Sequence, residues 1–231
     1  TFRFTPAPLG NANLISFSNG INFDTRTLGK SGEPKLPPEL TTSYREDEYG
    51  YYVIQIKGPI YEYQKNQLEA NGIKVFFYIK NYGFVCGVQN QAMLNQIRAM
   101  GDVNWAGVYQ PAYKVCDRID QEPDEFTATI LLFDDADLNK TVNSVKELTR
   151  SQNKMLTSEF KGDGYTNKII RTKIKKSDVV NIAQLKEVYW IEPWHQEVLM
   201  NQGSQWCVQK GTADSTRTIW RKNIRGSGQL I

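Results

Sequence analysis

The chain has 231 residues, 40% of them hydrophobic and 23% charged, and this composition is typical of a globular protein with one large domain or two small ones. No run of about 18 apolar residues occurs, which excludes a membrane-spanning helix. The formal net charge of +3 is too small to indicate nucleic-acid binding on its own.

The first 48 residues show neither helical nor strand periodicity. They contain several glycines and the proline-rich run from Pro34 to Pro38, so we expect an extended arm over residues 1–48. Residues 1–4 have neither the apolar region nor the cleavage site of a signal peptide. Either the chain is cytoplasmic or a signal peptide has been removed from it.

A patterned unit occupies residues 49–118. Residues 51–57 predict a strand, because they are aromatic or β-branched and contain no breaker. Residues 60–71 show a helical stripe that ends at Asn71 and Gly72, where glycine tolerates the left-handed conformation after a helix. Four more elements complete the unit: strands over 73–79 and 84–88, a helix over 92–100, and a strand over 103–115 interrupted at Pro111.

The same order of elements returns over residues 119–200, after a charged linker at 117–124. The predicted elements are a strand over 126–133, a helix over 138–148, a hairpin of 155–160 and 168–174, a helix over 179–185 and a strand over 188–191. We expect Asp134 and Asp135 to cap the first of these helices, and Ser177 and Asp178 to cap the second.

Both units therefore have the order β-α-β-β-α-β, and their last strands also match in sequence at Val103-Asn104-Trp105 and Val188-Tyr189-Trp190. This pattern predicts an α+β protein with two tandem ferredoxin-like domains, each built on an antiparallel sheet. Two helices would cover one face of each sheet and leave the other face open. An open sheet face favours a protein partner.

Residues 201–231 are polar at first, and we expect a linker followed by a further domain that is truncated. The segment Ile224-Arg225-Gly226-Ser227-Gly228-Gln229-Leu230-Ile231, a few residues after Trp220, resembles the opening of the catalytic domain of subtilisin-like serine proteases. The family's catalytic aspartate would follow Ile231. The resemblance therefore implies a pro-region with no catalytic triad of its own and no cofactor or metal.

A second motif supports the same family. The run Val188-Tyr189-Trp190-Ile191-Glu192-Pro193-Trp194-His195 is similar to the end of subtilisin-type pro-regions, although Trp194 stands where the family has an aspartate. Residues 105–114 also resemble the end of an extra pro-type domain of larger subtilases. The resemblance implies a secreted protein that acts as an intramolecular chaperone and temporary inhibitor of the catalytic domain in the same precursor.

The family pattern also implies particular site residues. Self-cleavage would fall between Met200 and Asn201, and the preceding tail, Glu197-Val198-Leu199-Met200, would lie in the protease cleft as an added strand. Glu197 departs from the apolar residue that the family usually has at this position. Glu192 would accept hydrogen bonds from helix N-terminal amides of the catalytic domain.

Two other functions remain open from the residues alone. The first alternative is a free-standing protease inhibitor or binding module of the same fold. The second is a tandem RNA-binding protein. Residues 80–87 resemble the RNA-recognition signature of a third strand, and Tyr52 would supply a second stacking ring. The single histidine, His195, has no serine or carboxylate partner in a recognisable motif, so we do not expect it to be catalytic.

The remaining polar and thiol groups favour structural roles. The three cysteines, Cys86, Cys116 and Cys207, cannot all pair within one chain, and we expect free thiols. The aspartates at 134, 135 and 137 lack the glycine and distal glutamate of a calcium loop, so helix capping explains them better. The basic residues between Lys168 and Lys176 form either a solvated face or a docking patch for an acidic partner.

Overall fold

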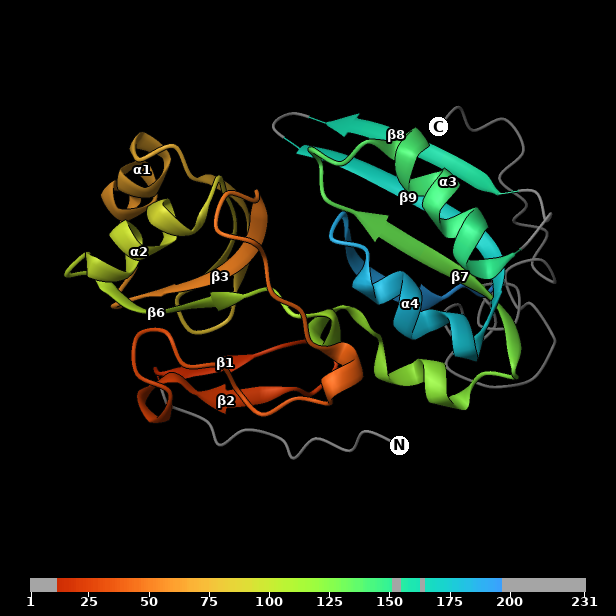
Figure 1. Ribbon diagram of the computed structural model, residues 1–231, viewed down its shortest axis with the longest axis horizontal. Coiled ribbons are helices and arrows are strands. Elements are labelled where there is room, and N and C mark those ends of the chain that lie inside the picture. Colours follow the sequence, from red (N-terminus) through yellow and green to blue (C-terminus); the bar gives the residue numbers. More distant parts are fainter. Residues whose placement is uncertain (1–11, 151–154, 163–164, 197–231) are drawn as a thin grey trace, which may run out of the picture. The chain divides into compact units, whose positions relative to one another are not determined.

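The computed structural model describes residues 12–150, 155–162 and 165–196. These residues form a mixed α+β structure with two four-stranded antiparallel sheets, a two-stranded sheet and four α-helices (Figure 1). The predicted α+β class with antiparallel sheets is confirmed. By its contacts, the described part of the chain up to Trp194 belongs to a single compact unit, Thr1–Trp194.

The first four-stranded sheet has the strand order β4-β5-β3-β6, with every neighbouring pair antiparallel. Its elements have the predicted β-α-β-β-α-β order: β3 (Gly50–Ile56), α1 (Glu62–Ala70), β4 (Lys74–Ile79), β5 (Gly83–Val88), α2 (Gln91–Ala99) and β6 (Val103–Val108). Helix α1 ends where predicted, and Gly72 comes after it with a φ of +78°, a conformation that glycine adopts at low cost.

The second sheet has the strand order β10-β7-β9-β8. As in the first sheet, the two central strands are the first and third strands of the unit in chain order. Its elements are β7 (Glu125–Leu132), α3 (Leu138–Thr149), β8 (Leu156–Gly162), β9 (Tyr165–Lys175), α4 (Val179–Gln184) and β10 (Val188–Pro193). A short 3-10 helix, η5 (Lys176–Asp178), precedes α4. The sequence patterns thus predicted most elements to within a few residues, although the strand predicted over 103–115 already ends at Val108.

Each sheet is covered by its two helices on one face. In the first sheet, the buried side chains Ile54 and Phe84 pack against Leu68 of α1 and Leu94 of α2. In the second, alternate residues of β7 and β9 pack against Val145 of α3 and Ile182 of α4. The alternation of strand side chains between two faces explains why every second residue is in each core.

The other face of the first sheet is also covered, which differs from the predicted open face. The segment predicted as an extended arm contains a hairpin of β1 (Leu14–Ser16) and β2 (Asn22–Asp24), and Ile15 of this hairpin is fully buried against the sheet. Gln55 on β3 is buried as well, and its amide donates to the carbonyl oxygens of Ala12 and Asn81 at 3.2 and 3.0 Å. The strands are only three residues long, too short for periodicity to reveal them.

The two sheets meet through aromatic side chains and through the linker between them. Phe133, just after β7, stacks on Tyr51 of β3 with ring centroids 3.7 Å apart. The linker contains the 3-10 helices η3 (Pro111–Lys114) and η4 (Asp117–Gln121), and between them the Cys116 amide donates to the carbonyl oxygen of Ile191. Both connections lie within the unit Thr1–Trp194.

The predicted helix caps need correction. Of the three aspartates expected to cap helices, Asp137 does cap α3, because its carboxylate accepts from the Lys140 amide at 3.0 Å, whereas Asp134 and Asp135 do not. Asp134 instead pairs with Lys74, while Asp135 accepts from the hydroxyls of Tyr49 and Tyr51 at 2.5 and 2.8 Å.

The predicted cap of α4 is also wrong. The carboxylate of Asp178 makes no cap hydrogen bond to α4 and instead accepts from the Lys175 amide at 3.0 Å, at the start of η5. Among the other predictions, Cys86 and Cys116 are free and buried as expected, whereas Cys207 lies outside the described residues.

Removing the α3 cap should lower stability without affecting the core. Asp137→Ala leaves the Lys140 amide without its acceptor, and we expect a loss of about 1 kcal/mol in the free energy of unfolding, measured by urea titration. Asp47→Ala, which removes an exposed carboxylate in the loop before β3, is the matched control and should change stability by less than about 0.5 kcal/mol. Equal losses in both variants would contradict the assignment of the cap.

Candidate docking face

The second sheet has a face that its helices do not cover. Helices α3 and α4 lie on the same side of the sheet (Figure 1), over Ile130 and Ile170, which are fully buried. The residues between these point to the opposite side, because strand side chains alternate. We call this side the docking face and define it by the outward residues of β10, β7, β9 and β8: Trp190, Glu192, Thr127, Thr129, Leu131, Ile169, Arg171, Lys173, Leu156 and Ser158, together with Trp194.

One row across the docking face is apolar. The strand register aligns Trp190 with Leu131 and Leu131 with Ile169, so the three side chains cross three adjacent strands. All three are partly exposed. Leu156, on the edge strand β8, is 55% exposed. Apolar side chains gathered in this way mark a surface whose burial by a partner would be favourable in free energy.

The neighbouring row is polar and includes Glu192. The register places Glu192 beside Thr129 and Thr129 beside Arg171. One carboxylate oxygen of Glu192 accepts from the Trp190 indole nitrogen at 3.0 Å and lies 4.0 Å from the Arg118 guanidinium. Burial first, and then the charge of Glu192, raise the pKa of Tyr189 above its ordinary value of 10. Glu192 is therefore held in place, and part of its carboxylate faces solvent.

An arginine and a tryptophan stack at the end of the docking face. The Arg171 guanidinium lies over the Trp194 ring, with 4.7 Å between its central carbon and the ring centroid, and Trp194 is 37% exposed. The Trp194 amide donates to the Thr127 carbonyl oxygen at 2.8 Å, which continues the pairing of β10 with β7. The Arg171 Nε atom is buried and has no hydrogen-bond partner among the described residues. Arginine and tryptophan are enriched at the energetic centres of protein interfaces.

The basic residues of β9 divide between the two faces. Arg171 and Lys173 belong to the docking face, and Lys175 points to the same side at the end of β9. Lys168 points to the other side and donates to the Ala136 carbonyl oxygen at 2.5 Å. Lys173 pairs with the Glu125 carboxylate, so part of the positive charge is already neutralised.

An aromatic cleft borders the docking face. Its volume is about 610 Å³, and Leu131 and Trp190 of the docking face form one of its walls. The rest of the lining comes from the hairpin, from β4 and the residue after it, from the segment 109–113, and from β10, and it includes Phe17, Phe77, Tyr109, Tyr113 and Tyr189. The apolar row therefore continues into a concave surface.

Sequence reasoning identified some of these residues and missed others. Trp105 and Trp190, which the sequence matched at the ends of the two units, both have partnered indole nitrogens, and these donate to the Gly32 carbonyl and to Glu192. The stacking of Arg171 on Trp194 was not predicted, because it joins strands distant in the chain. Leu156 was placed in a strand, and its alternation with Ser158 is the signal that places both on one face.

The predicted tail lies outside the described residues. This holds for Glu197, Val198, Leu199 and Met200, and for the proposed bond between Met200 and Asn201. Among the predicted site residues, only Glu192 is described, and it lies on the docking face.

The RNA-binding alternative loses its stacking ring. Tyr52 is buried on the helix-covered face of the first sheet, beside Phe84 and Cys86 of the RNA-recognition-like segment. Base stacking requires aromatic rings that are exposed on the open face of the sheet. The geometry of the first sheet therefore does not provide such a platform at Tyr52.

The described residues contain neither a candidate metal site nor a candidate membrane span. No group of three or more histidine, cysteine, aspartate or glutamate side chains there is placed to hold a metal ion. No helix there has the length and apolarity needed to cross a membrane.

Comparison with protein families gives a match over the first part of the chain. Residues 12–110 match the model of a domain of unknown function, DUF8729. This range contains the hairpin and the whole first four-stranded sheet with its helices, and it ends just before η3. No curated protein matches the chain.

Proposed function

We propose that this chain is the pro-region of a secreted subtilisin-like serine protease, and that it acts as an intramolecular chaperone and temporary inhibitor of the catalytic domain in the same precursor. In this proposal both four-stranded units are ferredoxin-like domains. The strand orders β4-β5-β3-β6 and β10-β7-β9-β8 support this assignment, since each places the first and third strands of its unit at the centre.

The observation that carries the proposal is the docking face, together with its continuity with the predicted tail. An apolar row, the carboxylate of Glu192 and the Arg171–Trp194 pair lie together on the side of the second sheet that its helices leave open. The last strand of this sheet leads directly, through Trp194, into the predicted cleft-binding tail. A partner bound on this face would therefore receive the tail beside it.

The mechanism would rest on two linked contacts. The docking face would bury its apolar row on the catalytic domain, and the exposed oxygen of Glu192 would accept from helix N-terminal amides. The tail would lie in the cleft as an added strand and remain there as a product after cleavage. Because the tail is tethered to a docked domain, its effective concentration is high and inhibition is tight. The pro-region would bind the native protease and not the unfolded protease. Such binding stabilises the native state, which accounts for the chaperone role.

Inhibition of a purified subtilisin by the full chain tests both contacts. We expect removal of residues 195–231 to weaken inhibition by at least about 100-fold, because the docked domain alone lacks the tail. We expect Leu156→Asp to weaken inhibition by about 10- to 100-fold while leaving stability unchanged, because it puts a charge on the docking face at an exposed position.

Thr157→Asp is the matched control for the face variant. Thr157 is also exposed on β8, but it points away from the docking face, so its charge should not affect inhibition. Equal inhibition by the shortened and full chains would contradict the role of the tail. Equal inhibition by Leu156→Asp and Thr157→Asp would contradict the role of the face, and a full chain that does not inhibit would contradict the whole proposal.

A further inference from the structure

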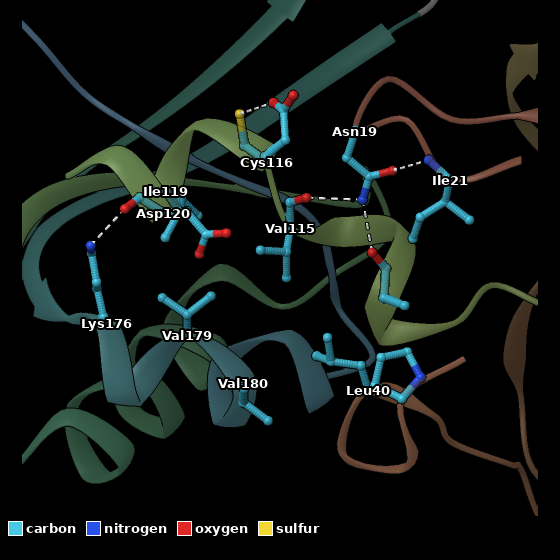
Figure 2. A pocket seen from close by; sticks show the side chains of 13 residues that line it. Asn19, Ile21, Leu40, Val115, Cys116, Ile119, Asp120, Lys176, Val179 and Val180 are labelled. Atoms are coloured by element: carbon cyan, nitrogen blue, oxygen red, sulfur yellow. Dashed lines mark hydrogen bonds between the residues drawn. The ribbon is translucent and has the colours of Figure 1, made fainter. Parts of the chain in front are cut away.

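A separate apolar pocket lies where the N-terminal segment, the linker and α4 meet. Its volume is about 140 Å³, and it is distinct from the docking face (Figure 2). Its wall is formed by the loop after β1, the 3-10 helix η2 (Pro38–Leu40) with the residue before it, the linker, and the start of α4. The apolar lining consists of Ile21, Pro37, Leu40, Ala112, Val115, Ile119, Val179 and Val180.

Two polar side chains of this wall, Asn19 and Lys176, are engaged with the protein. The Asn19 amide donates to the carbonyl oxygens of Ala112 and Val115 at 2.8 and 2.9 Å, and its oxygen accepts from the Ile21 amide at 3.3 Å. At the opposite side, the Lys176 ammonium donates to the Asp120 carbonyl oxygen at 2.9 Å. Figure 2 shows these bonds on two sides of the space. Among the described residues, none of the buried side chains that lack a hydrogen-bond partner lines this pocket.

Such a pocket suits an apolar ligand better than water. A buried water needs two to four hydrogen-bond partners, and a comparable apolar cavity of about 150 Å³, engineered in another protein, stays dry and binds benzene. Here Asn19 and Lys176 are already bonded to the protein, and the rest of the wall away from the mouth consists mostly of aliphatic groups. The exposed aspartates at 117 and 120 mark the mouth, where an anionic ligand would meet like charge.

We propose that this pocket, bounded by Ile21, Leu40, Ile119 and Val179, is a binding site for a small uncharged apolar molecule of about the size of benzene. Filling it would add contacts to three segments that are far apart in the sequence, and so would stabilise the connection between the hairpin, the linker and the second sheet. Binding at this site does not depend on the proposed protease function.

The thiol of Cys116 provides a readout that is specific to the site. It lines the pocket and donates to the Asp117 carboxylate at 3.7 Å, whereas Cys86 is fully buried in the other core. A ligand in the pocket should block alkylation of Cys116. Cys86 reports any general change in unfolding in the same molecule.

The experiment combines a thermal shift with alkylation followed by peptide mass spectrometry, both on the full chain. With benzene at about ten times its dissociation constant, we expect Tm to rise by about 3 °C. The alkylation rate of Cys116 should fall by about tenfold under the same conditions, and the rate at Cys86, which reports unfolding, should fall by no more than that. A Tm that does not rise, or a Cys116 alkylation rate that benzene leaves unchanged, would overturn the proposal.

Two variants on helices locate the effect. Val180→Phe places a larger ring in the pocket wall and should remove both responses to benzene. Val142→Phe makes the same change at a partly buried valine of α3, outside the pocket, and should keep both responses. If Val180→Phe does not fold, the smaller Val180→Leu should reduce the benzene-induced Tm shift by at least half. Full benzene responses in the folded Val180 variant would overturn the assignment.

Discussion

Replacing Phe133 with alanine should lower the free energy of unfolding by about 4 kcal/mol, the range found for large aromatic residues removed from cores. Phe133 is buried and belongs to the second unit, but its ring stacks on Tyr51 of the first sheet at 3.7 Å. The rings of Phe76 and Tyr189 also lie 5.0 and 5.5 Å away. Alanine would leave a cavity among rings from both units.

The consequence of this position is that both sheets should weaken together. Amide hydrogen exchange measured by mass spectrometry separates the two units, because peptides from β3 and β7 report different sheets. In Phe133→Ala we expect lower protection in both sets of peptides. Loss of protection confined to β7 and its neighbours would show that the aromatic contact does not couple the sheets.

Phe133→Leu is the matched variant. Leucine keeps most of the apolar volume and loses the ring stacking, so it should cost about 1 to 1.5 kcal/mol. A leucine variant as unstable as the alanine variant would show that the ring geometry, and not the filled volume, dominates the contact.

Local patterns predicted the elements of the two four-stranded units well. Strand alternation and helical stripes depend on neighbouring residues, and these determine which face of β7 or α3 is apolar. The repetition of one order of elements strengthened the prediction, because each unit supported the interpretation of the other. The mixed α+β class followed from this pattern alone.

The N-terminal segment shows where local patterns fail. Ile15 is buried and Gln55 is satisfied only because the short hairpin packs on the face of the first sheet. Strands of three residues cannot show a period, and proline and glycine around them favour a loop prediction. Gln55, a fully buried glutamine near the end of β3, hints at a backbone partner, since buried amides need hydrogen bonds.

The candidate site could be predicted only in part for a related reason. Glu192 was found through its motif, whereas its neighbours on the docking face come from other strands. Thr129 and Arg171 lie beside it through the register of β7 with β10 and β9, which no single stretch of sequence contains. The same limit explains the caps: Asp135 lies next to a helix start, but its carboxylate accepts from two tyrosines of the first sheet.

Lys114 is the site of the second large effect. It is 1% exposed, and its ammonium group donates to the Leu185 carbonyl oxygen at 2.9 Å, which ties the linker to the end of α4. Burial lowers the pKa of Lys114 from 10.5 to about 7, and the negative charge of Glu187 opposes this only in part. A pKa difference of this size corresponds to about 4 to 5 kcal/mol of destabilisation at neutral pH.

The sign of the pH dependence is set by proton binding. Between about pH 7 and 10.5 the unfolded chain carries a proton on Lys114 that the folded chain lacks, so stability rises with pH in this window. Below about pH 7 both states are protonated and the penalty stays constant. Burial raises the pKa of Tyr51 and Tyr109, so stability falls again above about pH 10, where unfolded tyrosines ionise.

Lys114→Met should therefore stabilise the protein at pH 7 by about 2 to 3 kcal/mol. This is less than the full penalty, because the Leu185 carbonyl oxygen loses its donor. The gain should shrink by about 1.5 kcal/mol between pH 7 and 8.5, because removing the proton from the unfolded lysine costs less as the pH approaches its unfolded pKa. Urea titrations at both pH values measure the difference.

Lys30→Met is the control for Lys114→Met, because it removes a similar hydrogen bond from a lysine that is not buried. The Lys30 ammonium also donates to a backbone carbonyl oxygen, that of Arg98, at 2.9 Å, but the residue is exposed. Its replacement should change stability by less than about 0.5 kcal/mol at either pH. If Lys114→Met behaves like Lys30→Met, the amine of Lys114 is solvated in the folded protein. A gain that is present at pH 7 and smaller at pH 8.5 would instead show that a neutral lysine joins the linker to the second sheet.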